Sequence, residues 1–596
     1  MLEEEWTDYM SKWWCADFET TSSKNLEKDG CVRVWLWSLV GVEDGEKFYG
    51  FDIQSFLKEL KRRKCKKVFF HNLKFDGKFI VDYFMRNNFE YGTDYEVIID
   101  GLASWYEVKW KYDGTHTIKF WDSAKKFPGT SVQSLGEFVN LPKLEKPYFD
   151  KYYPIDYKPT EEEIKYCIRD SEVVAKAMLT MLEQGFTSMT MATDCFRYAR
   201  DKCLNGRYYR DYMPVLDNFT HNFCKQSYKG GISYLKPEYE DIEINNVKVF
   251  DVNSLYPWVM HDCPLPVGYG RYTTEKPSDD KLYIVHFQAE FYVKQNKFPF
   301  LQIKNTPRYV NNQFIEYSNG IEDLYLTSVD YKNFKNNYKI LDEFDHEYIE
   351  FDSEIGLLRP HIDEWMQKKK YYQQQNMEDF RYIAKTMMNG FYGKTSTRTE
   401  RQNVVPSFDL KKDQVSYANK ITSCIEPIYV PYGSFVTSWA RDKLINSALS
   451  VWKEFIYCDT DSIHCFEMDN YPLDIHPTDL GKWKDETAKG AYEYARYIKQ
   501  KTYCHARPGI KNGKPIKEIV EIRAAGLNKD SRDGIPFEDF KYGLKIEAGN
   551  LKMKVVPGGA ILVPTDWELT HDDQEIVMQY LKLQNAELED YYDREN

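Results

Sequence analysis

Long apolar runs are absent from this sequence, and their absence argues against a membrane-spanning protein. No apolar stretch in the 596 residues approaches the ~20 residues with which a helix crosses a bilayer. The pattern of a signal peptide, a basic start followed by an apolar segment, is also missing, because the N-terminus is acidic at Glu3 to Glu5. We therefore expect an intracellular protein without a transmembrane segment.

Paired cysteines are missing as well. The 12 cysteines form no CxxC pair and show no Cys/His spacing that suggests a zinc site. Most of them, such as Cys15, Cys167 and Cys458, lie in apolar or mixed segments, which predicts buried and reduced thiols. A disulfide scaffold and a structural zinc module are therefore not expected.

An excess of positive charge is the third absence. The formal net charge is −13, and this average argues mildly against a nucleic-acid partner. DNA binding, however, needs only a local basic stripe. Charge runs are usually solvated faces, but basic clusters that could form such a stripe occur at residues 61–67, 368–370, 499–501 and 552–554.

Apolar and aromatic residues are abundant enough for several packed cores. The hydrophobic fraction is 42% and the aromatic fraction 16%, and a single core rarely grows beyond roughly 250–300 residues. Pro159, the N-cap Thr160 and Glu163 form the signature of a capping box at a helix start. Further strands and helices around it predict a first domain of ~190 residues. The expected strands cover residues 13–18, 31–40, 68–70, 104–110 and 116–121.

The remaining chain predicts further units of mixed secondary structure. A strand at 247–250 delivers Asp251, and a helix at 434–454 leads into a strand at 455–458. One helix is expected from His361 to Tyr392, with a stop signal at Gly393. The other expectations are an irregular inserted subdomain at 263–358, a projecting hairpin or loop at 395–427, a turn at 557–559, and an acidic amphipathic helix after 570.

Two widely separated sets of carboxylates carry the chemistry. Asp17 and Glu19 lie two apart on one expected strand, as do Asp459 and Asp461 at the end of another, so each pair projects to one face. Asp251 joins the second pair. Clustered carboxylates repel one another unless a cation holds them, and oxygen ligands suit Mg²⁺ or Mn²⁺. Because two metals about 4 Å apart commonly move a phosphoryl group, the sequence predicts two phosphoryl-transfer centres.

The first set resembles the DEDD-type 3′–5′ exonuclease domain with its RNase H-like fold. Asp17 and Glu19 match the first motif of that family, Asn72 and Asp76 the second, and Tyr166 and Asp170, which share one helix face, the third. The resemblance implies that the four acids hold metal and that Tyr166 orients an attacking water. The family's lysine is either Lys143 or Lys146, and the implied DNA contacts are Thr20, Asn72, Phe75 and Ser123.

The second set resembles the family B DNA polymerases. Residues 251–257 (DVNSLYP) fit the DxxSLYP motif, 457–462 (YCDTDS) fit YxDTDS, 385–393 (KTMMNGFYG) fit KxxxNxxYG, and 501–503 (KTY) fit KxY. The resemblance implies catalytic roles for Asp251, Asp459 and Asp461, with metal at Asp251, Val252 and Asp461. It also implies two Mg²⁺ ions in each active site, replaceable by Mn²⁺. The implied nucleotide contacts are Tyr256, Lys369, Arg381, Lys385, Asn389 and Tyr392, and the implied DNA contacts are Tyr228, Gly230, Gly231, Thr437, Arg441, Lys501 and Tyr503.

Within family B the chain is most similar to the protein-primed polymerases of small bacteriophages with linear genomes. The likeness covers nearly the whole sequence and includes residues 71–77 (HNLKFDG), 228–231 (YKGG), 437–441 (TSWAR) and 556–559 (VPGG). It implies that a terminal protein acts as primer, that the template and primer are DNA, and that deoxynucleoside triphosphates are substrates. It further implies strand displacement without a helicase, and a monomer, apart from the heterodimer with the terminal protein, in the cytoplasm of the infected bacterium.

The resemblance divides this α+β multidomain chain into seven parts. The expected parts are an exonuclease domain at 1–190, the first part of the palm at 191–262, a terminal-protein-contacting insertion at 263–358, the fingers at 359–394, a second insertion for strand displacement and processivity at 395–427, the second part of the palm at 428–525, and the thumb with an acidic tail at 526–596.

Three other interpretations remain. A family B polymerase that extends an ordinary nucleic-acid primer would share all catalytic residues, and only the two insertions argue against it. A non-catalytic DNA-binding replication factor would be expected to have lost carboxylates, yet every expected carboxylate is present. A scaffold protein has no use for clusters of acids that cost free energy to fold together.

Overall fold

The computed structural model describes residues 13–570, with short gaps at 102–103, 115, 149–150, 305, 307, 310–312, 488–489, 512–513, 528 and 533. The acidic helix predicted after residue 570 lies outside the described residues. Within them, no helix is both long enough and apolar enough to cross a membrane.

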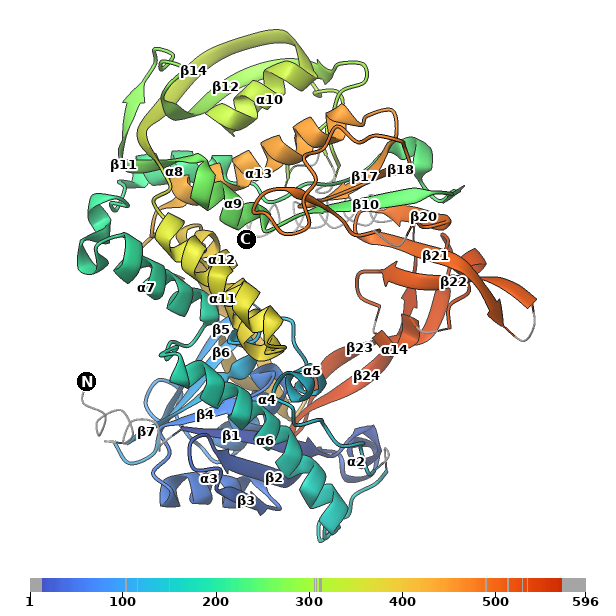
Figure 1. The fold of residues 1–596 in the computed structure, drawn as a ribbon. Helices are drawn as coiled ribbons and strands as arrows, with labels where there is room; N and C mark the ends of the chain where they lie inside the picture. The colour runs from blue at the N-terminus through green and yellow to red at the C-terminus, as the bar shows by residue number, and fades with distance from the viewer. Residues whose placement is uncertain are drawn as a thin grey trace, which may run out of the picture.

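The N-terminal part of the chain is built on a nine-stranded sheet, which lies at the bottom of Figure 1. The strand order is β16-β15-β5-β6-β7-β4-β1-β2-β3, with β1 antiparallel to β2 and parallel to β4. The strands predicted near 13–18, 104–110 and 116–121 are confirmed. The N-terminal strands are β1 (Trp13–Thr20), β2 (Val34–Gly41), β3 (Lys47–Gly50), β4 (Lys67–Phe70), β5 (Tyr95–Asp100), β6 (Ser104–Lys111) and β7 (Thr117–Asp122).

Helices cover this sheet and carry side chains toward β1. The predicted capping box is confirmed, because Thr160 accepts from the Glu163 main chain while the Glu163 carboxylate accepts from the Thr160 N–H. The helix that it starts packs against β1 and β2. The helices of this part are α2 (Ser23–Asp29), α3 (Ile53–Arg62), α4 (Leu73–Arg86), α5 (Val132–Phe138) and α6 (Glu161–Glu183).

A second sheet, of five strands, brings the acids of the second set together. Its order is β19-β10-β18-β17-β8, and Asp251 and Asp459 are both in register with Ser462. Helix α13 (Val430–Ser450) packs against β17 and β18, and α9 (Leu255–Asp262) follows β10. The strands are β8 (Ser233–Leu235), β10 (Val247–Val252), β17 (Phe455–Asp459), β18 (Ser462–Phe466) and β19 (Trp483–Asp485).

The segment 263–358 is more regular than the sequence indicated. It forms a four-stranded antiparallel sheet in the order β11-β14-β12-β13, at the top of Figure 1. The long strand β14 alternates poorly between buried and exposed positions, so it carries no clear period-two pattern. The elements are β11 (Pro264–Thr273), β12 (Leu282–Val293), β13 (Glu322–Thr327), α10 (Ser328–Asn337) and β14 (Tyr338–Ile355).

The single helix predicted from His361 to Tyr392 is wrong. Two helices, α11 (Arg359–Gln374) and α12 (Glu378–Thr395), pack against each other, and α12 runs through Gly393. Asn376, with φ 54°, breaks the helical path between them. Next to them lies α7 (Met191–Cys203), and α8 (Asn218–Ser227) packs against α13.

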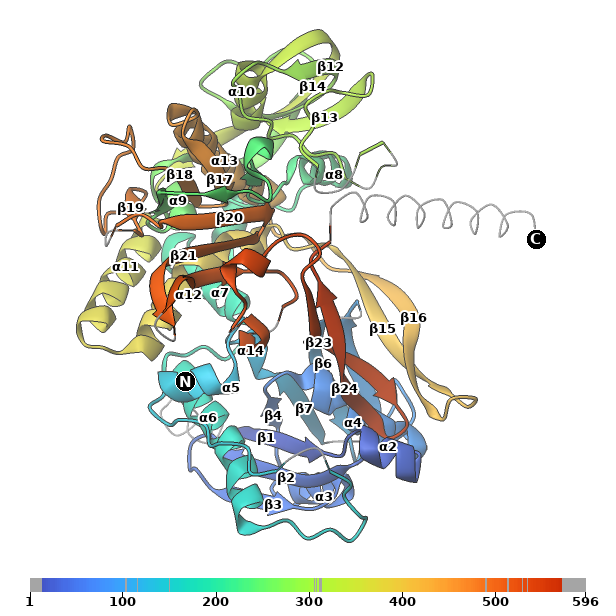
Figure 2. The same ribbon diagram turned by 90° about the vertical axis from the view of Figure 1, so that its right-hand side faces the viewer.

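The hairpin predicted at 395–427 is confirmed as β15 (Glu400–Asp409) and β16 (Gln414–Cys424). It does not project freely, because Asn403 of β15 pairs with Asp100 and extends the N-terminal sheet. A second hairpin, β23 (Lys545–Val556) and β24 (Gly559–Glu568), lies beside it in Figure 2 and contacts β16. Three segments that are far apart in sequence, β5, the β15–β16 hairpin and the β23–β24 hairpin, therefore pack together here.

The turn predicted at Pro557-Gly558-Gly559 is confirmed, and it docks on the N-terminal part. The Val32 N–H donates to Pro557 O at 2.9 Å, and the Gly558 N–H donates to Asp82 Oδ1 at 3.2 Å. Gly558 has φ 88°, and a Cβ there would lie 2.0 Å from Val32 O, so the contact requires glycine. Arg86 binds both Asp82 and Asp413 of the β15–β16 turn, at 2.7 and 3.0 Å.

A last small sheet lies between the five-stranded sheet and the β23–β24 hairpin. Its order is β22-β21-β20-β9, and all its neighbouring strands are antiparallel. Its elements are β9 (Glu243–Ile244), β20 (Tyr494–Lys499), β21 (Thr502–Lys511) and β22 (Lys514–Arg523), followed by α14 (Lys529–Arg532).

Candidate active sites

Carboxylates from three elements of the N-terminal part converge at β1, an interior strand of its sheet. Asp17 and Glu19 come from β1, Asp76 from the first turn of α4, and Asp170 from α6. Asp76 is 4% exposed and Asp170 6%, so these acids are nearly withdrawn from water. The structure thus brings together the four acids that the sequence predicted as a metal site.

The electrostatics of this cluster are unfavourable without a cation. Burial raises the pKa of Asp17 well above its usual value, and repulsion by Glu19, Asp76 and Asp170 raises it further. Burial likewise raises the pKa of Glu19 to about 7, although a hydrogen bond from the Tyr148 hydroxyl opposes the shift. The cluster therefore holds protons that a divalent cation would replace.

The residues present fit a divalent cation. Among the described residues Asp170 Oδ1 is buried without a hydrogen-bond partner, as a metal-binding oxygen would be in the absence of its ion. The other oxygen, Oδ2, accepts from Lys143 Nζ at 2.7 Å. Lys146 instead places its Nζ 4.3 Å from the centre of the Tyr148 ring. Of the two lysines left open by the sequence, Lys143 is the one that contacts a predicted metal ligand.

Tyr148 is the residue of this site that the sequence did not indicate. Its hydroxyl donates to Glu19 Oε2, and its ring packs edge-on against Tyr166 with centroids 6.0 Å apart. It lies in a loop with three other tyrosines, at 152, 153 and 157, so no spacing or motif separated it from its neighbours.

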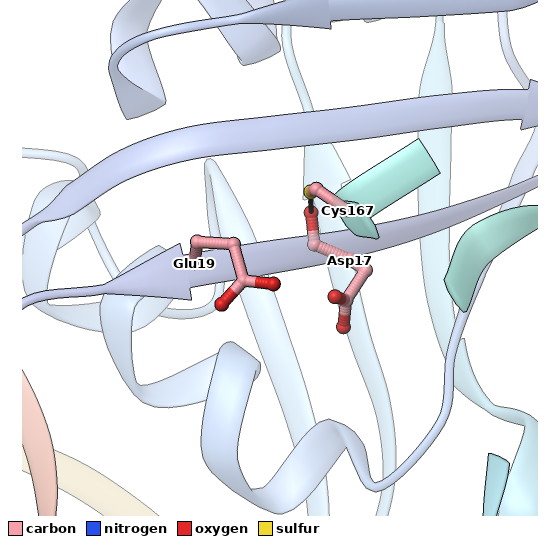
Figure 3. A group of neighbouring side chains, drawn as sticks. All are labelled: Asp17, Glu19 and Cys167. Atoms are coloured by element: carbon pink, nitrogen blue, oxygen red, sulfur yellow. Dashed lines mark hydrogen bonds between the residues drawn. The ribbon is translucent and has the colours of Figure 1, made fainter. Parts of the chain in front are cut away.

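Cys167 lies close to the acids but faces the other way. Its Sγ is within 4.8 Å of carboxylate oxygens of Asp17 and Glu19. The thiol donates to the main-chain carbonyl of Asp17 at 3.8 Å, and Figure 3 shows both carboxylates directed away from it. Because burial also raises the pKa of the thiol, Cys167 is a buried packing residue, as expected for the cysteines of this chain.

The residues predicted to contact DNA near this site differ in accessibility. Asn72 is exposed, and Thr20 and Phe75 are half-buried, so all three present surface. Ser123 does not, because it is fully buried and its hydroxyl bonds to Phe70 O at 3.1 Å and to His71 Nδ1 at 3.0 Å. In this structure Ser123 supports the strand ends beside Asn72, and its side chain has no exposed surface.

The raised carboxylate pKa values predict a pH-dependent response to metal. Glu19 ionises near pH 4.5 when unfolded and near 7 when folded, so the stability that its proton provides is present below 4.5 and is lost as the pH rises through 7. A cation replaces that proton. We expect Mg²⁺ to raise the unfolding temperature more at pH 8 than at pH 5.5, by a few degrees, relative to EDTA. Thermal scans in both buffers measure this difference, and an equal or smaller effect at pH 8 would contradict it.

The second set of acids meets across the five-stranded sheet. Asp251 is the penultimate residue of β10, Asp459 is the last residue of β17, and Asp461 lies in the turn between β17 and β18. The Val252 N–H donates to Asp461 O at 2.8 Å, which fixes the turn beside Asp251. Thr460 holds φ 57° within that turn, and its N–H donates to Ile232 O. All three acids line one cavity of about 830 Å³.

Asp251 and Asp461 form the repelling pair of this cavity. Burial raises the pKa of Asp251 to about 7, and repulsion by Asp461 and Glu486 adds to the shift. The pKa of Asp461 is raised by burial too, with repulsion from Asp459. Asp459 is engaged by Lys501, whose Nζ lies 2.9 and 3.1 Å from its two oxygens. The pair therefore fits a divalent cation, with Val252 beside it, whereas Asp459 already has a cationic partner.

Four basic side chains gather opposite Asp251. Burial lowers the pKa of Lys369, and repulsion by Lys385, Arg381 and Lys484 lowers it further. Lys369 comes from α11, and Lys385 and Arg381 from α12, so the two packed helices present their cations together. The arrangement places positive charge next to the acids, although Arg381 also pairs with Glu378 and Lys484 with Glu486.

Lys484 is the member of this group that the sequence did not predict. It is in register with Asp251 because β19 pairs with β10. The three-residue strand β19 follows an irregular segment, and such a short element gives no periodic signal.

Two predicted nucleotide-binding tyrosines stack beside the cavity. The rings of Tyr256 and Tyr392 lie 4.4 Å apart at an angle of 32°. Asn389, predicted with them, donates its amide to Lys385 O at 2.8 Å within α12. The DxxSLYP and KxxxNxxYG motifs thus meet at one place. Their order in the sequence did not by itself require this.

The loop 228–231 lies against the catalytic turn, as a DNA contact would require. Gly230 and Gly231 are exposed and Tyr228 is half-buried. A Cβ on Gly231 would lie 2.7 Å from Thr460 Oγ1, so the loop approaches the turn closely enough to need glycine.

Two other predicted DNA contacts are buried, and one of them, Arg441, supports this loop. Arg441 is 3% exposed, pairs with Asp330 at 2.6 Å, and donates to Lys229 O and Gly230 O at 2.6 and 2.7 Å. Thr437 is 2% exposed, and its hydroxyl bonds within its own helix. Neither side chain has surface for DNA in this structure. Arg441 acts through the loop carbonyls that it holds.

Comparison with known proteins decides the family. A family model described as "DNA polymerase type B, organellar and viral" matches residues 95–480. The chain belongs to this family. It is 31% identical over 591 residues to the DNA polymerase of Bacillus phage phi29, a match that covers 93% of this chain and 98% of the relative. The DNA polymerase of Streptococcus phage Cp-1 is 28% identical over 604 residues, with 95% and 100% covered.

The solved structures agree with this assignment to type B polymerases. The structure of phi29 DNA polymerase with primer-template DNA and incoming nucleotides superimposes with a TM-score of 0.85 at 28% identity, covering 94% of this chain and all of the other. The predicted α+β multidomain polymerase fold is therefore confirmed. The chain is a DNA-directed DNA polymerase that depends on divalent metal, and it resembles those of bacteriophages.

Proposed function

We propose that this polymerase replicates a linear viral genome by protein priming, displaces the non-template strand and proofreads with a 3′–5′ exonuclease. The observation that supports two activities is the presence of two separate clusters of carboxylates on two different sheets, in which burial and repulsion by neighbouring acids raise the pKa of Asp17 and of Asp251. Only the cluster at Asp251 has the basic group of Lys369, Arg381 and Lys385 beside it. A triphosphate needs such cations and a strand being degraded does not, so synthesis belongs to the cavity at Asp251 and hydrolysis to the cluster at Asp17.

For synthesis, Asp251, Val252 and Asp461 would hold two Mg²⁺ ions, with Mn²⁺ able to substitute. When bound, these ions activate the primer 3′-hydroxyl and neutralise developing charge on the phosphates. Lys369 on α11 and Lys385 on α12 bind the triphosphate through their compact ammonium charges, and Arg381 on α12 binds it through its forked guanidinium. Tyr256 excludes a 2′-hydroxyl by contact with its ring, and Tyr392 stacks against the nascent base pair.

For hydrolysis, Asp17, Glu19, Asp76 and Asp170 would hold two ions that bind the scissile phosphate. Tyr166 orients the attacking water through a hydroxyl that both donates and accepts. Lys143 neutralises and positions Asp170, and Tyr148 fixes one oxygen of Glu19. The exposed Asn72 and the half-buried Thr20 and Phe75 bind the end of the single strand.

The partners follow from the relatives and from the two additional segments. Solved phi29 polymerase complexes hold primer-template DNA and incoming nucleotides, which supports DNA and deoxynucleoside triphosphates as partners here. We assign the sheet at 263–358 to the terminal protein and the hairpin at 400–424 to strand displacement. The enzyme would act as a monomer, paired with the terminal protein at initiation, in the cytoplasm of the infected bacterium.

The priming mode is tested by initiation itself. Purified enzyme, incubated with its genome ends, the phage's terminal protein, Mg²⁺ and labelled dATP, is expected to yield a protein-linked nucleotide that survives denaturing electrophoresis. The Asp461→Ala variant should give none. If wild-type enzyme extends an annealed DNA primer but never labels the terminal protein, an ordinary primed polymerase is the correct interpretation.

A further inference from the structure

Under the polymerase cavity lies a chain of hydrogen-bonded titratable side chains that the proposed reaction does not use. Glu521 Oε2 and His505 Nδ1 are 3.3 Å apart, His505 Nε2 lies 2.9 Å from the Tyr497 hydroxyl, and that hydroxyl lies 2.7 Å from His464 Nδ1. His505 and Tyr497 are fully buried and His464 is 1% exposed. Glu521 opens to the cavity that contains the catalytic acids.

The chemistry of the groups fixes the direction of this chain. An ionised carboxylate only accepts hydrogen bonds, so His505 carries its proton on Nδ1 and accepts at Nε2. The Tyr497 hydroxyl gives its single proton to His505 and can then only accept from His464 Nδ1–H. The pKa of Glu521 is lowered, first of all by its bond to His505, which keeps it ionised. One carboxylate therefore sets the tautomers of both histidines.

The same residues surround Tyr503, which with Lys501 is a DNA contact implied by the KxY motif and is here assigned to the primer end. Strand pairing sets His505 opposite Glu521 and Tyr503 opposite Arg523. Arg523 donates from Nε to Glu521 Oε1 at 2.9 Å, and its guanidinium is near enough to the Tyr503 hydroxyl to oppose the rise in pKa that burial causes there. The Tyr503 ring rests on His505, His464 and Tyr497, with centroids 4.9, 5.3 and 5.5 Å away.

We infer that Glu521 and His505 are positioning residues that hold Tyr503 and Arg523 in place to grip the primer end in the polymerase cavity. The chain also reaches the strand of the catalytic acids, since His464 pairs with Val249, two residues before Asp251. This inference rests on the proposed role of Lys501 and Tyr503. Loss of Glu521 or His505 loosens the hold on the primer end but removes no residue that binds metal or nucleotide.

The test separates binding of the primer from chemistry. For Glu521→Gln we expect KM for primer-template to rise roughly fivefold to tenfold, because a charge-assisted bond to Arg523 is lost, while kcat changes less than about twofold. The looser primer end should also pass to the exonuclease more often, raising digestion relative to synthesis. Glu518→Gln, on the same strand but exposed and away from the cavity, is the matched control and should leave KM unchanged.

A second variant guards against a folding defect. His505→Phe keeps a ring but removes both bonds, and the double variant with Glu521→Gln should be no worse than the more severe single one, as members of one chain are not additive. If neither variant raises KM while Tyr503→Ala does, the inference about Glu521 and His505 is wrong, whereas the assignment of Tyr503 to the primer end is supported. If Tyr503→Ala and Lys501→Ala also leave KM unchanged, the proposed grip itself fails, and the inference with it.

Discussion

Replacing Asp461 by Ala is expected to abolish DNA synthesis, lowering the rate of nucleotide addition by on the order of 10³-fold or more, which is about 4 kcal/mol of lost transition-state stabilisation. Asp461 and Asp251 are half-buried acids of the polymerase cavity; burial raises the pKa of both, and repulsion adds to the shift, from Asp459 at Asp461 and from Asp461 at Asp251. Removing one leaves the other unable to hold a pair of cations against the triphosphate. Exonuclease activity, on a separate sheet, should stay within about twofold of wild type.

Single-turnover extension of a labelled primer with Mg²⁺ and a correct nucleotide measures this loss, and digestion of single-stranded DNA measures the spared activity. Asp469→Ala is the matched control, because it removes an exposed aspartate eight residues along and should extend primers normally. Near-normal extension by the Asp461 variant would refute the assignment of the cavity. Loss of both activities would indicate a folding defect rather than a lost ligand, and circular dichroism distinguishes the two.

Replacing Asp17 and Glu19 together by Ala is expected to have the opposite outcome. Digestion should fall by on the order of 10³-fold, since two of the four proposed ligands are lost, while primer extension continues. The same change should not lower the unfolding temperature in EDTA. Burial and repulsion already penalise the charged forms of both acids, so the metal-free protein loses nothing by their removal.

Digestion of a mismatched primer and thermal scans in EDTA are the measurements. A matched control replaces two exposed acids of the same part of the chain, Glu27→Ala with Glu43→Ala, and should leave digestion unchanged. If the Asp17 and Glu19 variant digests DNA at the wild-type rate, the N-terminal cluster is not the hydrolytic site. A marked drop of its unfolding temperature in EDTA would show instead that the acids support the fold.

Burial separated the predicted DNA contacts whose side chains reach the surface from those whose side chains do not. The motif 437–441 predicted DNA contacts at Thr437 and Arg441, but Arg441 is held by Asp330, a residue 111 positions earlier in the chain. Ser123 was predicted in the same way and is closed off by Phe70 and His71. A motif indicates that a residue is important at a site. Only its neighbours in space show whether its side chain faces the ligand or supports another residue that does.

Secondary structure was predictable where one face of an element is buried and its ends carry capping or turn residues. The helix that starts at Thr160 met these conditions. The strand at Trp13 was predictable for another reason, because it is a short apolar run that is buried on both faces. The sheet at 263–358 did not meet these conditions, because β14 is half-exposed along most of its 18 residues and shows no steady alternation. The break between α11 and α12 rests on a single left-handed asparagine, Asn376, which no periodicity signals.

The amino-acid sequence by itself determined that Asp17 and Glu19 project together, because residues two apart on a strand share a face, and which family the motifs resemble. The same argument does not hold for Asp459 and Asp461, because Asp461 lies in the turn after β17 and not on the strand. Tertiary structure alone decided which neighbours complete each site, including Lys143 rather than Lys146 at Asp170, Tyr148 at Glu19 and Lys484 opposite Asp251. The physical reason is that pairing between strands distant in sequence sets these contacts. Burial and charge at a site depend on the sum of such contacts and not on local pattern.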